Sequence, residues 1–179
     1  MGTPTDRADR ISADASEADR HLALELQEFV YGTLTVMVAI GGLVGSSEPP
    51  TAGRAIAVIL GVAFATMLAH TFAALTGMHV ANRRPVRRAE AIVELGHSWR
   101  IVLAAIPSIV VLAISATGLY STVTAMRISN GLAVLALIVI GLIAARRAGS
   151  SVFTSVVLVT LATTMGLVIV ALELFVHHL

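Results

Sequence analysis

The stretch AIAVILGVAFATMLAHTFAALTGMHV, Ala55 to Val80, is an apolar run of 26 residues with a histidine, His70, well inside it. As an α-helix it would be about 39 Å long, which exceeds the roughly 30 Å hydrocarbon core of a bilayer. The stretch therefore predicts a transmembrane helix. A titratable group at such a depth is costly unless it meets a partner or water, so His70 is the first candidate for a functional residue.

The composition extends this prediction to the rest of the chain. The sequence has 179 residues, of which 56% are hydrophobic and 13% charged, and its mean hydropathy is +0.88. These values are too apolar for one soluble domain. The chain contains no cysteine, which excludes disulfides, thiolate metal sites and a cysteine nucleophile. A net charge of +1 gives no general attraction to nucleic acid.

Further apolar runs predict an all-α, polytopic membrane protein with five transmembrane helices. The expected spans are residues 28–45, 55–80, 99–119, 128–145 and 152–176. Residues 1–20 are polar and are expected to form a mobile cytoplasmic arm, with residues 21–179 as a single domain. Pro107 predicts a kink in the third span, because proline cannot donate to the carbonyl of Leu103.

The arginines predict the orientation of the chain. All 12 basic residues are arginine, and five spans with the amino terminus in the cytoplasm leave only Arg54 and Arg127 outside. The first residues lack the pattern of a signal peptide, so the first helix is expected to be retained. The sequence thus predicts a multi-pass protein of the plasma or inner membrane.

A cluster of four arginines follows the second span. Its members are Arg83, Arg84, Arg87 and Arg88. Clustered arginines just inside a span can bind anionic lipid head groups. The alternative, which we favour from the sequence, is that they only fix the topology.

Polar residues in the first three spans predict a track that opens toward the cytoplasm. Glu28, Tyr31 and Thr35 share a face of the first helix. Thr35 should lie at about the same depth in the membrane as His70, so the first helix is the expected neighbour of His70. The predicted track consists of Glu28, Tyr31, Thr35, Thr66, His70 and Ser108. It could carry a proton or small ion, since an imidazole in water titrates at about pH 6.5. Alternatively, His70 is neutral and hydrogen-bonds to Thr35 or Tyr31 as a structural contact between helices.

The last predicted span carries a second polar group, toward the outside. Glu173 and His177 are one turn apart, and with His178 they supply ligand types that zinc accepts. Two or three ligands at the end of the chain are weak evidence for a metal, so no metal site is predicted. The favoured interpretation is a salt bridge from Glu173 to Arg127 or Arg54.

Several short elements resemble a known group of proteins. These elements are EFVYGT at residues 28–33, LAHTFA at 68–73, HSW at 97–99 and the segments AARRAGSS and GLVIVALELFVHH near the end. On these residues the chain resembles a family of small, uncharacterised integral membrane proteins of actinobacteria. The resemblance implies that Glu28, Tyr31 and His70 are features of that family, and it implies no activity.

The leading hypothesis is a proton or small-ion channel or transporter that uses the track from Glu28 through Tyr31 to His70. Five short helices leave little room for a pore, and Gly41 and Gly45 offer a close helix contact, so a homo-oligomer in the lipid bilayer is expected. The alternative is a scaffold or assembly partner that transports nothing. No catalytic motif is visible, so neither an enzyme nor a cofactor is expected.

Overall fold

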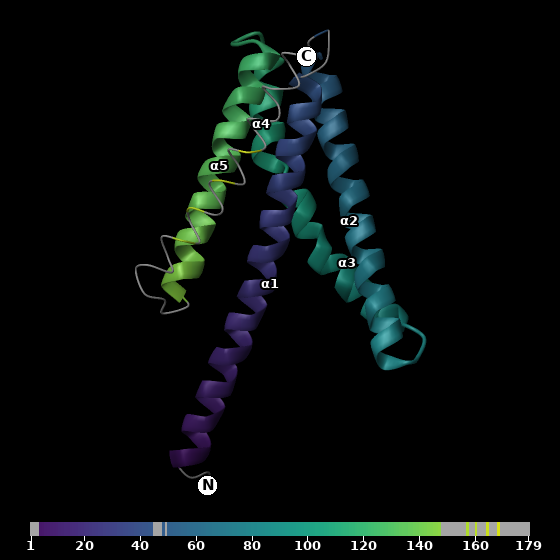
Figure 1. Cartoon of the computed structure of the whole chain (residues 1–179), viewed down its shortest axis with the longest axis vertical. Helices are drawn as coiled ribbons and strands as arrows, with labels where there is room; N and C mark the ends of the chain where they lie inside the picture. Colours follow the sequence, from purple (N-terminus) through teal and green to yellow (C-terminus); the bar gives the residue numbers. More distant parts are fainter. Residues whose placement is uncertain are drawn as a thin grey trace.

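The computed structural model describes residues 4–44, 48 and 50–147, and the single positions 157, 160, 164 and 168; side chains are described from Leu22 onward, except at 23, 145 and 147. Within this part the chain is helical and forms no strand. The helices are α1 (Pro4–Val44), α2 (Ala52–Asn82), α3 (Arg88–Leu103), α4 (Ile106–Ser115) and α5 (Thr122–Arg147), shown in Figure 1.

Four helical segments are long and apolar enough to cross a membrane. They are Leu24–Val44, Ala52–Asn82, Arg88–Ser115 and Thr122–Ala144. Each overlaps one of the first four predicted spans, which confirms the all-helical class and the apolar helices. The predicted fifth span, 152–176, lies outside the described residues except for isolated positions.

The first helix is longer than its apolar pattern predicts. α1 begins at Pro4 and continues to Val44, so residues 4–20 belong to the same helix as the first span. Proline suits the first turn of a helix, because its missing N–H has no partner there in any case. The mobility expected for residues 1–20 stays a prediction.

The third span is interrupted where Pro107 predicts it. α3 ends at Leu103, and Pro107 lies in the first turn of α4. Pro107 has no N–H to donate to the Leu103 carbonyl. At this point the N–H of Ala105 donates to the carbonyl of Val102, three residues back, at 3.0 Å. The break separates a partly polar helix, α3, from an apolar one, α4.

The bundle packs around α1. α1 lies between α5 on one side and α2 with α3 on the other (Figure 1), and it contacts all three. The main apolar core includes side chains that are completely buried: Ile40, Ile59, Ile101, Leu112 and Met126. A smaller cluster of Met37, Ala133 and Leu137 joins α1 to α5.

One glycine sets the contact between α1 and α3. A Cβ added to Gly32 would lie 2.6 Å from the carbonyl oxygen of Ile101 and 2.8 Å from the Cβ of Ala104. These distances are shorter than van der Waals contact, so only glycine fits. The two backbones can therefore approach closely, which small residues at a contact also allow between helices in membranes.

The up-and-down order of the helices brings the arginine-rich segments to one end. The amino terminus of α1, the connection between α2 and α3, and the carboxyl end of α5 all lie at this end (Figure 1). The connections from α1 to α2 and from α4 to α5 lie at the opposite end. The four arginines after α2 and the arginines at the end of α5 are thus on the same side of the bundle.

Candidate functional site

Glu28 and His70 form a direct contact between α1 and α2. Glu28 Oε1 lies 2.7 Å from His70 Nε2. At this distance a proton must lie between the two atoms, because two lone pairs would repel each other. Glu28 is 8% exposed, and the side chain of His70 is 30% exposed. A carboxylate and an imidazole that share a proton can take up and release one.

Tyr31 packs on the same histidine. It lies three residues after Glu28, and its ring centroid is 5.8 Å from that of His70, with the ring planes inclined by 45°. The spacing puts Glu28 and Tyr31 on one face of α1. The structure therefore brings together Glu28, Tyr31 and His70, the three residues on which the predicted track depended most.

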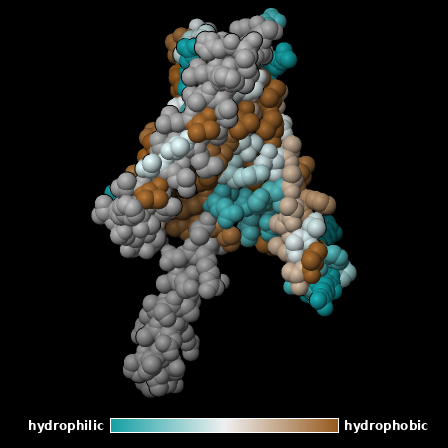
Figure 2. Space-filling model, viewed as in Figure 1, coloured by the Kyte–Doolittle hydropathy of each residue, from teal (hydrophilic) through white to brown (hydrophobic). Residues whose placement is uncertain are grey.

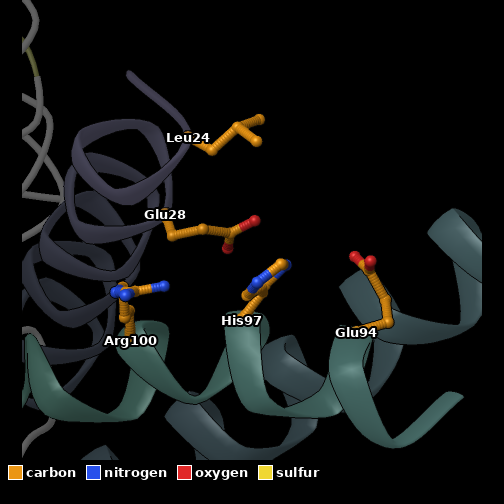
Figure 3. Close-up of a pocket in the computed structure, with 5 residues that line it drawn as sticks. All are labelled: Leu24, Glu28, Glu94, His97 and Arg100. Carbon is orange, nitrogen blue, oxygen red and sulfur yellow. The ribbon is translucent and has the colours of Figure 1, made fainter. Parts of the chain in front are cut away.

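Glu28 also lines a cavity between α1 and α3. Glu28 Oε2 is buried and has no hydrogen-bond partner among the described residues. The cavity has a volume of about 80 Å³. Its lining residues are Leu24 and Glu28 from α1, and Glu94, His97 and Arg100 from α3. Figure 3 shows the Glu28 carboxylate pointing from α1 across the cavity, with the side chains of His97 and Glu94 rising from α3.

An ion pair crosses from α1 to α3 beside this cavity. The guanidinium of Arg100 donates to Glu25 Oε1. Glu25 therefore balances the charge of Arg100, while the carboxylates of Glu28 and Glu94 remain at the cavity. Figure 2 shows a hydrophilic area where α1 and α3 lie side by side.

The site lies toward the end of the bundle that carries the arginine cluster. Glu28 is near the start of the apolar segment Leu24–Val44, and His70 is in the second half of Ala52–Asn82, which runs in the opposite direction. The cavity residues Glu94, His97 and Arg100 follow the connection from α2 to α3 closely.

The structure corrects the predicted partner of His70. The sequence suggested Thr35 or Tyr31 as the hydrogen-bond partner, whereas the observed partner is Glu28. The prediction estimated the depth of each residue by assuming that both helices stand perpendicular to the membrane and end at the same level. In the structure, α2 continues to Asn82. Thr35 and Thr66 are both half-buried.

Ser108 does not belong to the track with His70. It is buried and lines a separate cavity of about 20 Å³ between α1, α4 and α5. Thr33 and Ser129 line this second cavity with it. The prediction placed Ser108 by depth alone, but the first turn of α4 directs it toward α5.

The four arginines of the predicted lipid contact differ in their surroundings. Arg84 Nη2 and Nη1 bind the two carboxylate oxygens of Glu90 at 2.5 and 3.1 Å. Glu90 also accepts a hydrogen bond of 3.0 Å from the backbone N–H of Arg87. Arg84 thus fixes the connection between α2 and α3, whereas the side chains of Arg83, Arg87 and Arg88 are exposed.

The predicted outer polar site is described only in part. Arg127 is exposed on α5. Glu173 and His177 lie outside the described residues, so their predicted salt bridge stays a prediction. Within the described part of the chain, no three His, Asp or Glu residues lie close enough to hold a metal ion.

Four residues of the site were missed from the sequence. They are Glu25, Glu94, His97 and Arg100. Glu94, His97 and Arg100 recur at intervals of three, which places them along one face of a helix. This signal was available, but residues 81–98 fell between the second and third predicted spans, so Glu94 and His97 were not placed on the same helix as Arg100.

No known family model matches this chain, and no curated protein or solved structure matches it.

Proposed function

We propose that this chain is a multi-pass protein of the plasma or inner membrane, with its amino terminus in the cytoplasm, that moves protons or a small ion. In this proposal it acts as a homo-oligomer, and Glu28 and His70 bind and release the transported proton or ion. One observation carries the proposal: the 2.7 Å contact between a buried carboxylate and an imidazole at the edge of a polar cavity. Intramembrane ionisable residues are usually functional.

The geometry fits a proton-binding group with access from one side. Glu28 Oε1 shares a proton with His70, and the Glu28 side chain lines the cavity at the end of the bundle that carries the arginines. A proton arriving through the cavity can bind the Glu28 carboxylate, and the proton held between Oε1 and Nε2 can then stay on the imidazole. His70 is thus the residue that passes the proton further into the membrane.

The core beyond the site favours a second candidate function, that of a scaffold. The side chains in the half of the bundle away from the arginines include Ile40, Ile59 and Leu112, which are completely buried. These three apolar side chains pass no protons, and the buried polar groups in this half include those of Ser115, Ser129 and Asn130. A scaffold in which Glu28 and His70 only hold α1 against α2 needs nothing more than the described contacts. A conducting path needs a second copy or the predicted fifth span to complete it.

Flux measurements in liposomes separate the two functions. Proton flux driven by a pH or voltage gradient is measured with purified protein between about pH 5 and 8. We expect flux in the wild type and a loss of about tenfold or more in His70→Ala and Glu28→Gln, since positioned proton-transfer groups typically contribute at least that much. His79→Ala is the matched control, because His79 is exposed near the end of α2.

Two results would exclude the transport function. If liposomes with folded, reconstituted wild-type protein show no more proton flux than empty liposomes, the protein is a scaffold and not a transporter. Equal flux in the wild type and in both site variants would show that Glu28 and His70 are structural.

The structure of the connection between α2 and α3 distinguishes Arg84 from the other three arginines as a candidate for contact with lipid. We propose that Arg83, Arg87 and Arg88 contact anionic lipid head groups, and that Arg84 acts on them only by holding the connection. This division is supported by the bidentate pair of Arg84 with Glu90 and by the exposure of the other three side chains.

A further inference from the structure

We propose that the ion pair between Glu25 of α1 and Arg100 of α3 is a gate that controls whether water and protons reach Glu28 from the cavity. The proposal rests on the proposed function, because it adds a control to the same carboxylate. Glu28 lies between two contacts of α1 with α3. One turn after it, Gly32 lies against the backbone of Ile101. Three residues before it, toward the arginine-rich end, Glu25 binds Arg100.

The Glu28 carboxylate is closed off in this structure. Its Oε1 lies 2.7 Å from Nε2 of His70. Its Oε2 is buried and has no hydrogen-bond partner among the described residues. Burying a carboxylate oxygen without a donor is unfavourable, so water that reached Oε2 would stabilise the carboxylate. The structure is therefore a closed state, and hydration of Glu28 favours its opening.

The ion pair can break and form again because it borders water. The side chains of Arg100 and Glu25 are 29% and 33% exposed. An ion pair with this exposure contributes little to stability, since water competes for both charges. Arg100 also lines the cavity, and Figure 3 shows its side chain rising from α3 toward α1. Breaking the pair thus removes the contact that lies between Glu28 and the arginine-rich end.

The break between α3 and α4 allows α3 to move separately. α3 ends at Leu103, where the N–H of Ala105 donates to a carbonyl three residues back instead of four. α3 packs on α1 and α2, whereas α4 packs on α5 and α2. Because the break follows Ile101 closely, α3 can tilt about its contact with Gly32 while α4 stays in place.

An outward tilt of α3 opens the cavity toward Glu28. Glu25 is seven residues before Gly32, which corresponds to about 10 Å along α1, and Glu28 is between them. With the contact at Gly32 as the fixed end, the gap between α1 and α3 widens most at the arginine-rich end. Water enters from that end and reaches Glu28 before it reaches the apolar core.

The test is chemical labelling of Glu28 in purified, reconstituted protein. A water-soluble carbodiimide with glycine ethyl ester modifies carboxyl groups that water reaches, and mass spectrometry of the digested protein gives the rate at each residue. We expect slow labelling of Glu28 in the wild type. In Arg100→Gln and in Glu25→Gln it should be about fivefold faster, the change in the open population on losing one partly exposed ion pair.

Three further variants distinguish a gate from a general loss of packing. The charge swap that combines Glu25→Arg with Arg100→Glu restores an ion pair and should label Glu28 at the wild-type rate. Arg100→Lys keeps the positive charge and should also label slowly, so it serves where the charge swap does not fold. Glu94→Gln changes a carboxylate of the same cavity and leaves the pair in place, so its labelling should match the wild type.

The outcomes separate the gate from the transport function. Labelling of Glu28 at one rate in the wild type, Arg100→Gln and Glu25→Gln overturns the gate, as does fast labelling in the charge swap and Arg100→Lys. Fast labelling in the two Gln variants that the charge swap reverses, without proton flux in liposomes, supports the gate and overturns the transport function. Proton flux with labelling of Arg100→Gln at the wild-type rate does the reverse.

Discussion

Gly32 of α1 lies directly against the backbone of Ile101 in α3, and a Cβ on Gly32 would lie 2.6 Å from the Ile101 carbonyl oxygen. Arg100, the residue before Ile101, forms the ion pair with Glu25 on the same two helices. Glu28 is one turn before Gly32. The glycine contact therefore fixes the distance between the two walls of the cavity, one on each helix.

Substitution of Gly32 by alanine should force α1 and α3 apart. We expect Gly32→Ala to lower the free energy of unfolding by about 1–3 kcal/mol, the usual cost of overpacking against a backbone that cannot move aside. Unfolding of the purified protein in mixed micelles measures this change. Gly61→Ala is the control, because an added Cβ there meets nothing within 4 Å. Equal stability of the two variants would show that the helices have room at Gly32.

A double-mutant cycle measures the contact between Glu28 and His70 itself. We expect Glu28→Ala and His70→Ala to be coupled by about 0.5–2 kcal/mol, as found for polar contacts between membrane helices and between residues in contact. The control cycle combines Glu28→Ala with His79→Ala, whose imidazole Nδ1 instead lies 2.9 Å from the carbonyl of Arg84. Additive effects in the first cycle would mean that the pair contributes nothing to stability.

Hydropathy and periodicity predicted the helices well because the bilayer requires long apolar segments. The run from Ala55 to Val80 fell inside α2, and Pro107 marked the break between α3 and α4. The i, i+3 spacing of Glu28 and Tyr31 also indicated the face of α1 that meets His70. These features are local, so the sequence alone contains them.

The contacts between helices were harder to predict, because packing decides the tilt and rotation of each helix. Thr35 was expected beside His70, but the residue that contacts His70 is Glu28. Ser108 was expected on the same track, but it lines a separate cavity. The close contact at Gly32 was also missed, since Gly41 and Gly45 had the more familiar spacing. His97 was overlooked because the polar start of α3 reads as a connection.

The ion pair of Arg84 with Glu90 should order the start of α3. Glu90→Gln removes the negative charge that pairs with Arg84 and weakens the acceptor of the Arg87 N–H. The Arg87 amide should therefore exchange its hydrogen several-fold faster. Hydrogen exchange followed by mass spectrometry measures this. Glu48→Gln, in the connection at the other end, should leave the Arg87 amide unchanged. Unchanged exchange in Glu90→Gln would show that the pair does not order the connection.

The exposed arginines should differ from Arg84 in their effect on lipids. We expect the combined variant Arg83→Gln, Arg87→Gln and Arg88→Gln to retain fewer anionic lipids after purification, because each arginine near a charged surface contributes about 1 kcal/mol. Native mass spectrometry counts the retained lipids. Glu48→Gln provides the control for a change of charge at the opposite end. Equal lipid retention in the triple variant and the wild type would leave the arginines as topology signals alone.

Cysteine labelling tests the proposed orientation, since the chain has no cysteine of its own. Single cysteines replace Ala89 at the start of α3 and Leu119 before α5, both exposed and at opposite ends of the bundle. In right-side-out vesicles, an impermeant maleimide should label the cysteine at position 119 and not the one at position 89. The opposite result would place the arginine-rich end outside the cell, contrary to the usual distribution of arginine.

The same assay decides whether the predicted fifth span, 152–176, crosses the membrane. α5 ends at Arg147, on the side of the arginine cluster, so a further crossing would bring the end of the chain to the other side. A cysteine in place of Leu179 should then be labelled in right-side-out vesicles, together with the one at position 119. Labelling at 179 only after the vesicles are opened with detergent would show an even number of crossings. In that case the predicted pairing of Glu173 with Arg127 could not form at the outer surface, and the conducting path would need a second copy of the chain to complete it.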